Sequence, residues 1–534
     1  MRPNAKTAWF LAFTAIFAGL AGFVFWGTWS LDVVPVMPDA RTTYAADSIW
    51  RELCAVFGSG KLIPTDVMRL VGSPYLWQEL QYVVSLYFAA LGLAFFCRGR
   101  GLSRMASYGA GLLLAFSGYW LTLFSAGHLG WFKWMTYGTF AFAFADRAVR
   151  RGARLDWLML GALVSWAGFN QQDLWLLFTL LTGAYFVWCC VREHKLPWKG
   201  ALLALAVFAL IGLPNFAETL LVTVKGRQEQ IDRKENITDS TADDREQRWE
   251  FVTNWSMPPE DTLEFIQARV QGDTSCPFVL SINRARGVRP YSGALGRPLN
   301  ASRGNYRQHS LYVGWVTCLL ALTGAVFLLR KDAPFRKGDA LFFLIAAVGC
   351  YLLSLGRYLE PLYRLVFALP AGDLIRCPVK WHHLTEFSLV VLAAYGIDAL
   401  WSKAGRCGWA RVLVVALVTF GAVDLAREAR LYCAPVSVRV AREKGLNADF
   451  AVLRRQDLAN EQVSRMARAG LLRTVAHYLG QPDVYLMQVL KPFERSPLTL
   501  PKMPVSGWIS ILASLLVIVV AAKSAIWYII LKWK

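Results

Sequence analysis

The stretch WFKWMTYGTFAFAFADRAVRRGARLDWLMLGALVSWAGF, residues 131–169, decides the fold. Two apolar runs, 131–146 and 155–169, flank a short connection that is rich in arginine. Its basic residues are Arg147, Arg150, Arg151 and Arg154. Apolar runs of about this size are typical of membrane-spanning helices, and positive charge is costly to move across a bilayer. The pattern therefore predicts two spans joined by a cytoplasmic turn.

The same alternation continues in both directions along the chain. The connections Ser125–Gly130 and Asn170–Asp173, on either side of the stretch, contain no Lys or Arg, whereas the next ones outward are basic again. The alternation predicts that both termini are cytoplasmic and that every long loop lies outside. The predicted spans are 8–29, 75–97, 106–124, 131–146, 155–169, 174–191, 200–222, 310–329, 340–356, 386–402, 411–425 and 505–522.

The composition agrees with an all-α polytopic membrane protein of about twelve transmembrane helices. The chain is 55% hydrophobic and contains 22 Trp, 19 Tyr and 32 Phe, residues that favour the depth of the lipid headgroups. Its net charge of +20 comes largely from the predicted cytoplasmic connections, where anionic lipids supply the counter-charge. We therefore expect a cytoplasmic (inner) membrane location and no nucleic-acid partner.

Polarity divides the chain into five units. They are a membrane module, 1–222, with a first outer loop at 30–74; a polar outer insertion, 223–309; further membrane helices, 310–425; an outer helical unit, 426–504; and the last span with an interfacial tail, 505–534. Within the insertion, Ser256 precedes Pro258 and Pro259, which predicts a helix start capped by the Ser256 hydroxyl. In the outer unit, residues 446–480 are expected to form one or two amphipathic helices.

Ten scattered cysteines contain no CxxC pair and no Cys/His spacing typical of zinc. Four of them fall on the predicted outer side, where disulfides are permitted. These are Cys54, Cys276, Cys377 and Cys433. The sequence does not decide whether two of them are bridged.

The first outer loop carries the carboxylates that best suit catalysis. Asp32, Asp39 and Asp47 follow the first span. A carboxylate at this depth can act as a general base on an acceptor hydroxyl or hold a divalent cation, Mg²⁺ or Mn²⁺, against a diphosphate leaving group. The alternative is that these residues only solvate the loop.

Several segments resemble the YfhO-type bacterial membrane protein family, and the match covers most of 110–400. The family's Gly-His, Gly-His-Pro-Gln and Ser-Leu-x-Pro-Glu motifs are similar to Gly127-His128, Gly168-Phe169-Asn170-Gln171 and Ser256–Glu260, with Phe and Asn departing from the second. Its later motifs are similar to Tyr312-Val313-Gly314, Gly356–Pro370, Arg376–Lys380 and Gly396-Ile397-Asp398.

Members of that family are similar to the GT-C superfamily of glycosyltransferases. These multi-span proteins take sugar from a polyprenyl-phosphate donor on the outer membrane face, often with a catalytic Asp in the first outer loop. The resemblance therefore implies a GT-C-like fold and a membrane glycosyltransferase that acts on an envelope glycan, lipid or protein. Residues 30–60 do not align cleanly with the family's first loop, so the three aspartates compete for the catalytic role.

Basic side chains in the loop before residue 386 suit a lipid-linked phosphate. Arg376 and Lys380 stand four residues apart, next to His382 and His383. Arg can hold two phosphate oxygens in a fork, and Lys offers a point charge. The alternative is ordinary snorkelling to headgroups. In the same loop, Arg357 is expected to pair with Glu360.

Two short outer connections add polar groups at the same depth. His128 lies in a six-residue connection and is a candidate to donate to a phosphate or to orient a carboxylate, or else it simply caps a tight turn. Gln171 shares that ambiguity. Because the predicted spans are nearly free of ionisable residues, the pattern favours a surface transferase over a transporter or flippase of lipid-linked sugars. A scaffold without either activity is a third interpretation.

Among the three aspartates we select Asp39 as the catalytic carboxylate. Asp32 is close enough to the first span to serve as an interface anchor. Asp47 falls where a surface helix is expected to begin and suits a capping role. Asp39 follows Pro38 in an extended stretch that can reach back over the membrane face.

Overall fold

The computed structural model describes fifteen stretches of the chain, and the statements below concern these residues. They are 5–25, 33–36, 60–67, 74–126, 128–169, 172–234, 241–270, 310–329, 337–369, 372, 375–405, 407–433, 436–437, 451–454 and 503–533. Asp32, Asp39, Asp47, Gln171, Cys54 and Cys276 lie outside them.

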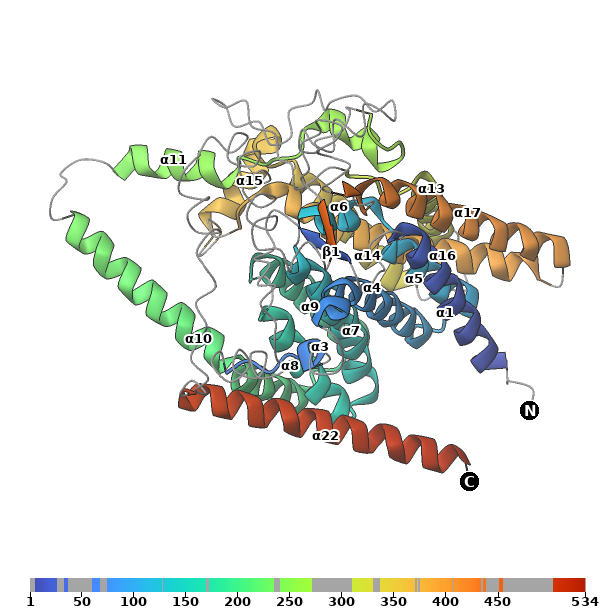
Figure 1. Cartoon of the computed structure of the whole chain (residues 1–534), viewed down its shortest axis with the longest axis horizontal. Coiled ribbons are helices and arrows are strands. Elements are labelled where there is room, and N and C mark those ends of the chain that lie inside the picture. Colours follow the sequence, from blue (N-terminus) through green and yellow to red (C-terminus); the bar gives the residue numbers. More distant parts are fainter. Residues whose placement is uncertain are drawn as a thin grey trace.

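Helices dominate these stretches and form one bundle with long apolar elements along its edges (Figure 1). The helices are α1 (Ala5–Val24), α3 (Pro64–Val67), α4 (Pro74–Gly99), α5 (Arg104–Ala115), α6 (Gly118–Ala126), α7 (Leu129–Arg151), α8 (Arg154–Gly168), α9 (Gln172–Arg192), α10 (Trp198–Lys234), α11 (Thr241–Val252), α13 (Trp315–Leu329), α14 (Lys337–Ser354), α15 (Glu360–Ala368), α16 (His382–Ala404), α17 (Gly408–Cys433) and α22 (Val505–Trp533). Three short 3₁₀ helices are η2 (Pro259–Phe265), η3 (Gly356–Leu359) and η5 (Pro378–Trp381).

The fold is that of a helical, multi-pass membrane protein. Each of the twelve predicted spans contains helix, but within the described residues seven helices are long and apolar enough to cross a bilayer, or eight if the bent pair α14–α15 is one span. Helices α8 and α13 have 15 residues each, about 22 Å of helix, against a hydrocarbon core of about 30 Å. Twelve crossings therefore stay a prediction.

The bundle core is held by helices that approach one another closely. A Cβ on Gly396 of α16 would lie 2.0 Å from the carbonyl oxygen of Leu320, and one on Gly324 of α13 would lie 2.2 Å from that of Leu392. These glycines let the backbones of α13 and α16 touch, which is a common way to pack helices where lipid surrounds them. Around this contact α16 also packs against α5 and α14, while α22 packs against α10 and α8 at one edge (Figure 1).

The predicted span 106–124 is broken in two. Helix α5 ends at Ala115 and α6 begins at Gly118, where the Gly118 N–H donates to the carbonyl oxygen of Tyr312 at 3.0 Å. In a continuous helix the Gly118 N–H would donate within the helix. Here it donates instead to a segment almost two hundred residues further along the chain. The break places Tyr119 and Trp120 in the first turn of α6.

Gly356 lies at a sharp turn after α14. Helices 338–354 and 356–368 are bent by 104° there, and Gly356 adopts a positive φ of 50°. A Cβ at this position would lie 2.1 Å from Ser256 Oγ and 2.6 Å from Pro378 Cγ, so only glycine fits. The turn therefore packs the segments around Ser256 and Pro378 against one another.

The predicted cap at Ser256 is wrong. Its hydroxyl donates to the Thr253 carbonyl at 2.7 Å and accepts the Arg357 N–H at 3.0 Å, while the element that follows is the 3₁₀ helix η2, preceded by Pro258. The predicted Arg357–Glu360 pair is wrong too. Arg357 Nε donates to the Thr253 carbonyl at 3.0 Å, and Glu360 pairs with Arg364, one helical turn away, at 3.0 Å.

A small sheet joins the segment after the first predicted span to residues 436–454, which were predicted to belong to the outer unit. Strand β1 (Val33–Val36) pairs antiparallel with β3 (Ala451–Arg454), and β2 (Val436–Ser437) pairs parallel with β3, in the order β1-β3-β2. Residues 451–454 were expected to be helical. Their β-branched and aliphatic sequence AVLR is instead used for strand pairing. The cysteines Cys377 and Cys433 are both buried and are not bridged to each other.

Candidate functional site

Five ring-bearing residues gather where α6, α7 and α16 begin. Trp131, on the first turn of α7, has its ring centroid 5.7 Å from that of His128 and 4.9 Å from that of His383. His383, on the first turn of α16, also stacks on Tyr119 at 4.1 Å and lies 4.2 Å from Trp120. We call His128, Trp131, Lys380, His382, His383 and Glu386, with Tyr119 and Trp120, the aromatic cluster.

Lys380 brings a positive charge to this cluster. Its Nζ lies 5.8 Å from the centroid of the Trp131 ring, and the residue is only 5% exposed. Lys380 is part of the 3₁₀ helix η5. The backbone of η5 is bonded to the segment between α11 and η2, because the Val379 N–H donates to the Trp255 carbonyl at 3.0 Å. Tyr119 Oη donates to the Val379 carbonyl at 3.1 Å. The insertion and α6 therefore position Lys380 together.

Arg376 contacts a different part of the molecule. The residue is exposed, and its guanidinium lies 5.3 Å from the centroid of the Phe251 ring at the end of α11. Between Arg376 and Pro378, Cys377 adopts a positive φ of 66°, an unusual conformation for a residue with a side chain. Arg376 thus packs on α11, whereas Lys380 packs on Trp131. The two cations that were expected to act together contact separate neighbours.

Glu386 is the member of the cluster that the sequence did not reveal. It lies one helical turn after His382 and His383, and all three residues are 0% exposed. Neither Glu386 oxygen has a hydrogen-bond partner among the described residues, and the same holds for both ring nitrogens of His383. The spacing His-His-x-x-Glu was visible, but the expected span began at residue 386, which left the histidines in a loop. A helix that begins at His382 places His382, His383 and Glu386 on the same face.

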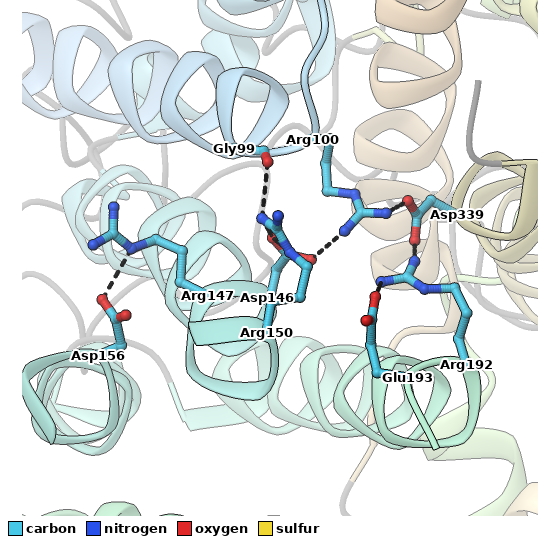
Figure 2. A network of polar contacts seen from close by, with 9 residues as sticks. All are labelled: Gly99, Arg100, Asp146, Arg147, Arg150, Asp156, Arg192, Glu193 and Asp339. Carbon is cyan, nitrogen blue, oxygen red and sulfur yellow. Dashed lines mark hydrogen bonds and ion pairs between the residues drawn. The ribbon is translucent and has the colours of Figure 1, made fainter. Parts of the chain in front are cut away.

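The opposite end of α7 takes part in a network of ion pairs with residues on or beside α4, α8, α9 and α14 (Figure 2). Arg100 bridges Asp146, at 2.6 Å, and Asp339, and Arg192 pairs with Asp339 and with Glu193. The network is completed by Arg150 with Asp146 and by Arg147 with Asp156. The side chains of Arg100, Asp146 and Asp339 are each at most 1% exposed. We call these residues the arginine network.

Helix geometry separates the two ends. Trp131 and Asp146 are fifteen residues apart on α7, and His383 and Asp398 are fifteen residues apart on α16, which is about 22 Å along either helix. Asp398 Oδ1 accepts the Ser103 N–H at 2.7 Å, close to Arg100 in the sequence. The arginine-rich connections therefore meet at one end of the bundle, and the aromatic cluster lies at the other.

Of the predicted site residues, the structure brings together His128, Lys380, His382 and His383, and it sets Arg376 apart. The three first-loop aspartates and Gln171 lie outside the described residues; strand β1 (Val33–Val36), which follows Asp32 in the sequence, pairs with β3. Within the described residues, no group of three or more His, Cys, Asp or Glu side chains is arranged to hold a metal ion. Comparison of the chain with protein-family models and with curated proteins finds no match.

Proposed function

We propose that this chain is a membrane glycosyltransferase. It moves a sugar from a polyprenyl-phosphate donor to an envelope glycan, lipid or protein on the outer face of the cytoplasmic membrane. In this proposal the chain crosses the membrane about twelve times with both termini inside, and its fold is GT-C-like. The aromatic cluster then lies at the outer end of the bundle.

The observation that carries the proposal is the convergence of His128, Lys380 and His383 on Trp131. These residues come from two connections that are more than two hundred residues apart in the chain. They meet at the end of the bundle away from the arginine-rich connections, which the positive-inside tendency assigns to the cytoplasm. A polyprenyl phosphate buries its tail in lipid and leaves its phosphate near a membrane surface. A lysine with neighbouring imidazoles is suited to hold that phosphate.

The chemistry requires few groups. An acceptor hydroxyl attacks the anomeric carbon of the sugar, the bond from that carbon to the phosphate oxygen breaks, and the polyprenyl phosphate leaves with the electron pair. Lys380 compensates the charge that develops on the phosphate. A first-loop carboxylate, for which we retain Asp39, takes the hydroxyl proton. A divalent cation, Mg²⁺ or Mn²⁺, remains a candidate partner of that carboxylate.

One observation favours a transporter or flippase of lipid-linked sugars as the second candidate. Glu386 and both histidines lie in the segment Pro378–Ala404, which is long and apolar enough to cross a membrane. Buried ionisable residues within spans often mark a transport pathway. The expectation that the spans are nearly free of such residues therefore does not hold for α16. A transporter would move labelled lipid-linked sugar across a vesicle membrane without forming a new glycosidic bond.

A transfer assay with a matched pair of variants tests the proposal. The full chain, reconstituted in lipid nanodiscs, is given a labelled polyprenyl-phosphate sugar and an acceptor mixture extracted from bacterial envelopes. Lys380→Met should weaken donor binding by about tenfold or more, because a charge-assisted contact is worth roughly 1.5–3 kcal/mol. Arg376→Met should change it much less, since Arg376 packs on Phe251. Equal effects of the two variants would show that Lys380 does not bind the donor phosphate. The absence of any labelled product would contradict the proposed transferase activity.

The same assay tests the choice of catalytic carboxylate. Asp39→Asn keeps the size and polarity of the side chain but cannot take a proton, so turnover should fall by about 10²–10⁴-fold. Asp32→Asn and Asp47→Asn are the comparisons, with donor binding measured in parallel to show that each variant is folded. Near-normal turnover of Asp39→Asn, together with loss in one of the other two, would move the role to that residue.

A further inference from the structure

Three titratable side chains share the first turns of α16. The helix begins at His382, and Glu386 follows His382 by four residues and His383 by three. Residues at these separations lie on the same face of a helix, within reach of one another. The face is covered by rings, because Phe265 lies 4.4 Å from His382 and Tyr119 stacks on His383.

Burial makes the charged form of this carboxyl group costly. Glu386 is 0% exposed, and neither of its oxygens has a hydrogen-bond partner among the described residues. An isolated carboxylate moved out of water loses far more solvation energy than a neutral acid does, so such a group takes up a proton. Glu428, another buried carboxylate, instead pairs with Arg269 at 2.9 Å.

The groups around Glu386 leave it without a fixed counter-ion. The Cys318 thiol on α13 is close enough to Glu386 for an electrostatic interaction. On the other side, the positive charge of Lys380 on η5 interacts electrostatically with the His383 ring. Tyr119 of α6 contributes a phenol that is committed to the Val379 carbonyl. The burial of His383 and the nearby positive charge of Lys380 both disfavour a charge on its imidazole, so His383 supplies no fixed counter-ion to Glu386.

We propose that Glu386 is a buried proton-binding site and that His382 and His383 are the imidazoles through which its proton is exchanged. The carboxyl group is neutral at rest, and its proton leaves and returns through the imidazoles, each of which holds the proton only in transit and is neutral before and after. Because only a proton is gained or lost, the inference needs no other reactant. It goes beyond sugar transfer and holds equally for a transferase and for a transporter.

Infrared spectroscopy of the reconstituted full chain tests the proposal directly. At neutral pH the wild-type protein should show the C=O stretching band of a protonated carboxyl group, and Glu386→Gln should remove it. Asp398→Asn is the matched control, because Asp398 is also buried but accepts the Ser103 N–H, and its replacement should leave the band in place. Absence of the band in the wild type, or its persistence in Glu386→Gln, would overturn the proposal.

Two further measurements separate a proton from other ligands and guard against misfolding. Glu386→Asp keeps a carboxyl group and should shift the band instead of removing it, which assigns the band even if the Gln variant does not fold. His383→Gln should slow the exchange of the band in D₂O. Loss of the wild-type band on adding Na⁺ or K⁺ at constant pH would instead identify an alkali cation site and overturn the proposal.

Discussion

The two ends of this helix bundle differ in the partners of their buried ionisable side chains. In the arginine network every carboxylate contacts at least one arginine, and Arg100 and Asp339 each contact two partners of opposite charge (Figure 2). In the aromatic cluster His383 packs against rings, and neither Glu386 nor the His383 ring has a hydrogen-bond partner among the described residues. Paired ions fix the helices that carry them, whereas an unpaired acid is free to change its protonation state. The ion pairs at one end thus hold the bundle together, whereas the other end buries an acid and imidazoles that no ion pair fixes.

The largest effect is expected at the arginine network. Arg100→Met would leave Asp146 with Arg150 alone and Asp339 with Arg192 alone, in surroundings that exclude water. Removing one partner of a buried ion pair costs about 3–5 kcal/mol, so the midpoint of thermal unfolding in detergent should fall markedly. Arg151→Met is the control, because Arg151 is exposed at the end of α7, the helix that carries Asp146, and should change stability by no more than about 0.5 kcal/mol. Similar midpoints for the two variants would break the comparison.

The smallest effect is expected at Glu386. Methionine has a similar volume and no charge, and replacing a buried polar group that has no partner is often neutral or stabilising. Glu386→Met should therefore change the free energy of unfolding by less than about 1 kcal/mol, measured by the same thermal denaturation. A loss comparable to that of Arg100→Met would mean that Glu386 is ionised and paired, and the two ends would then be alike.

The sequence predicted the helices well and their contacts in part. The alternation of basic connections predicted that Arg100, Arg147 and Arg192 lie at one end of the bundle, and they do. Hydropathy alone did not reveal the break at Gly118, because its cause is a hydrogen bond to Tyr312, far away in the chain. Likewise, the sequence predicted that Ser256 caps a helix, but its hydroxyl accepts the N–H of Arg357, about one hundred residues further along the chain.

The candidate site was predictable where it depends on loop placement and not where it depends on helix register. His128 and Lys380 were expected at one membrane face, and the structure brings both to Trp131. Glu386 was missed because its position beside His383 follows from a helix that begins four residues earlier than hydropathy indicates. Arg376 was expected beside Lys380, but the positive φ of Cys377 interrupts the regular spacing that this pairing assumed.

Gly356 has a consequence for the order in which the chain assembles. It lies against Ser256, one hundred residues earlier, and against Pro378, which begins η5, the segment immediately before α16. The ion pairs among residues 100–156 need only a short stretch of chain, so they are able to form as soon as α7 and α8 are in the membrane. The aromatic cluster, by contrast, has to wait until α16 has been synthesised and inserted. During synthesis the rings of Tyr119, Trp120 and Trp131 therefore face lipid or other chains for a long interval, which is when binding by membrane chaperones would matter most.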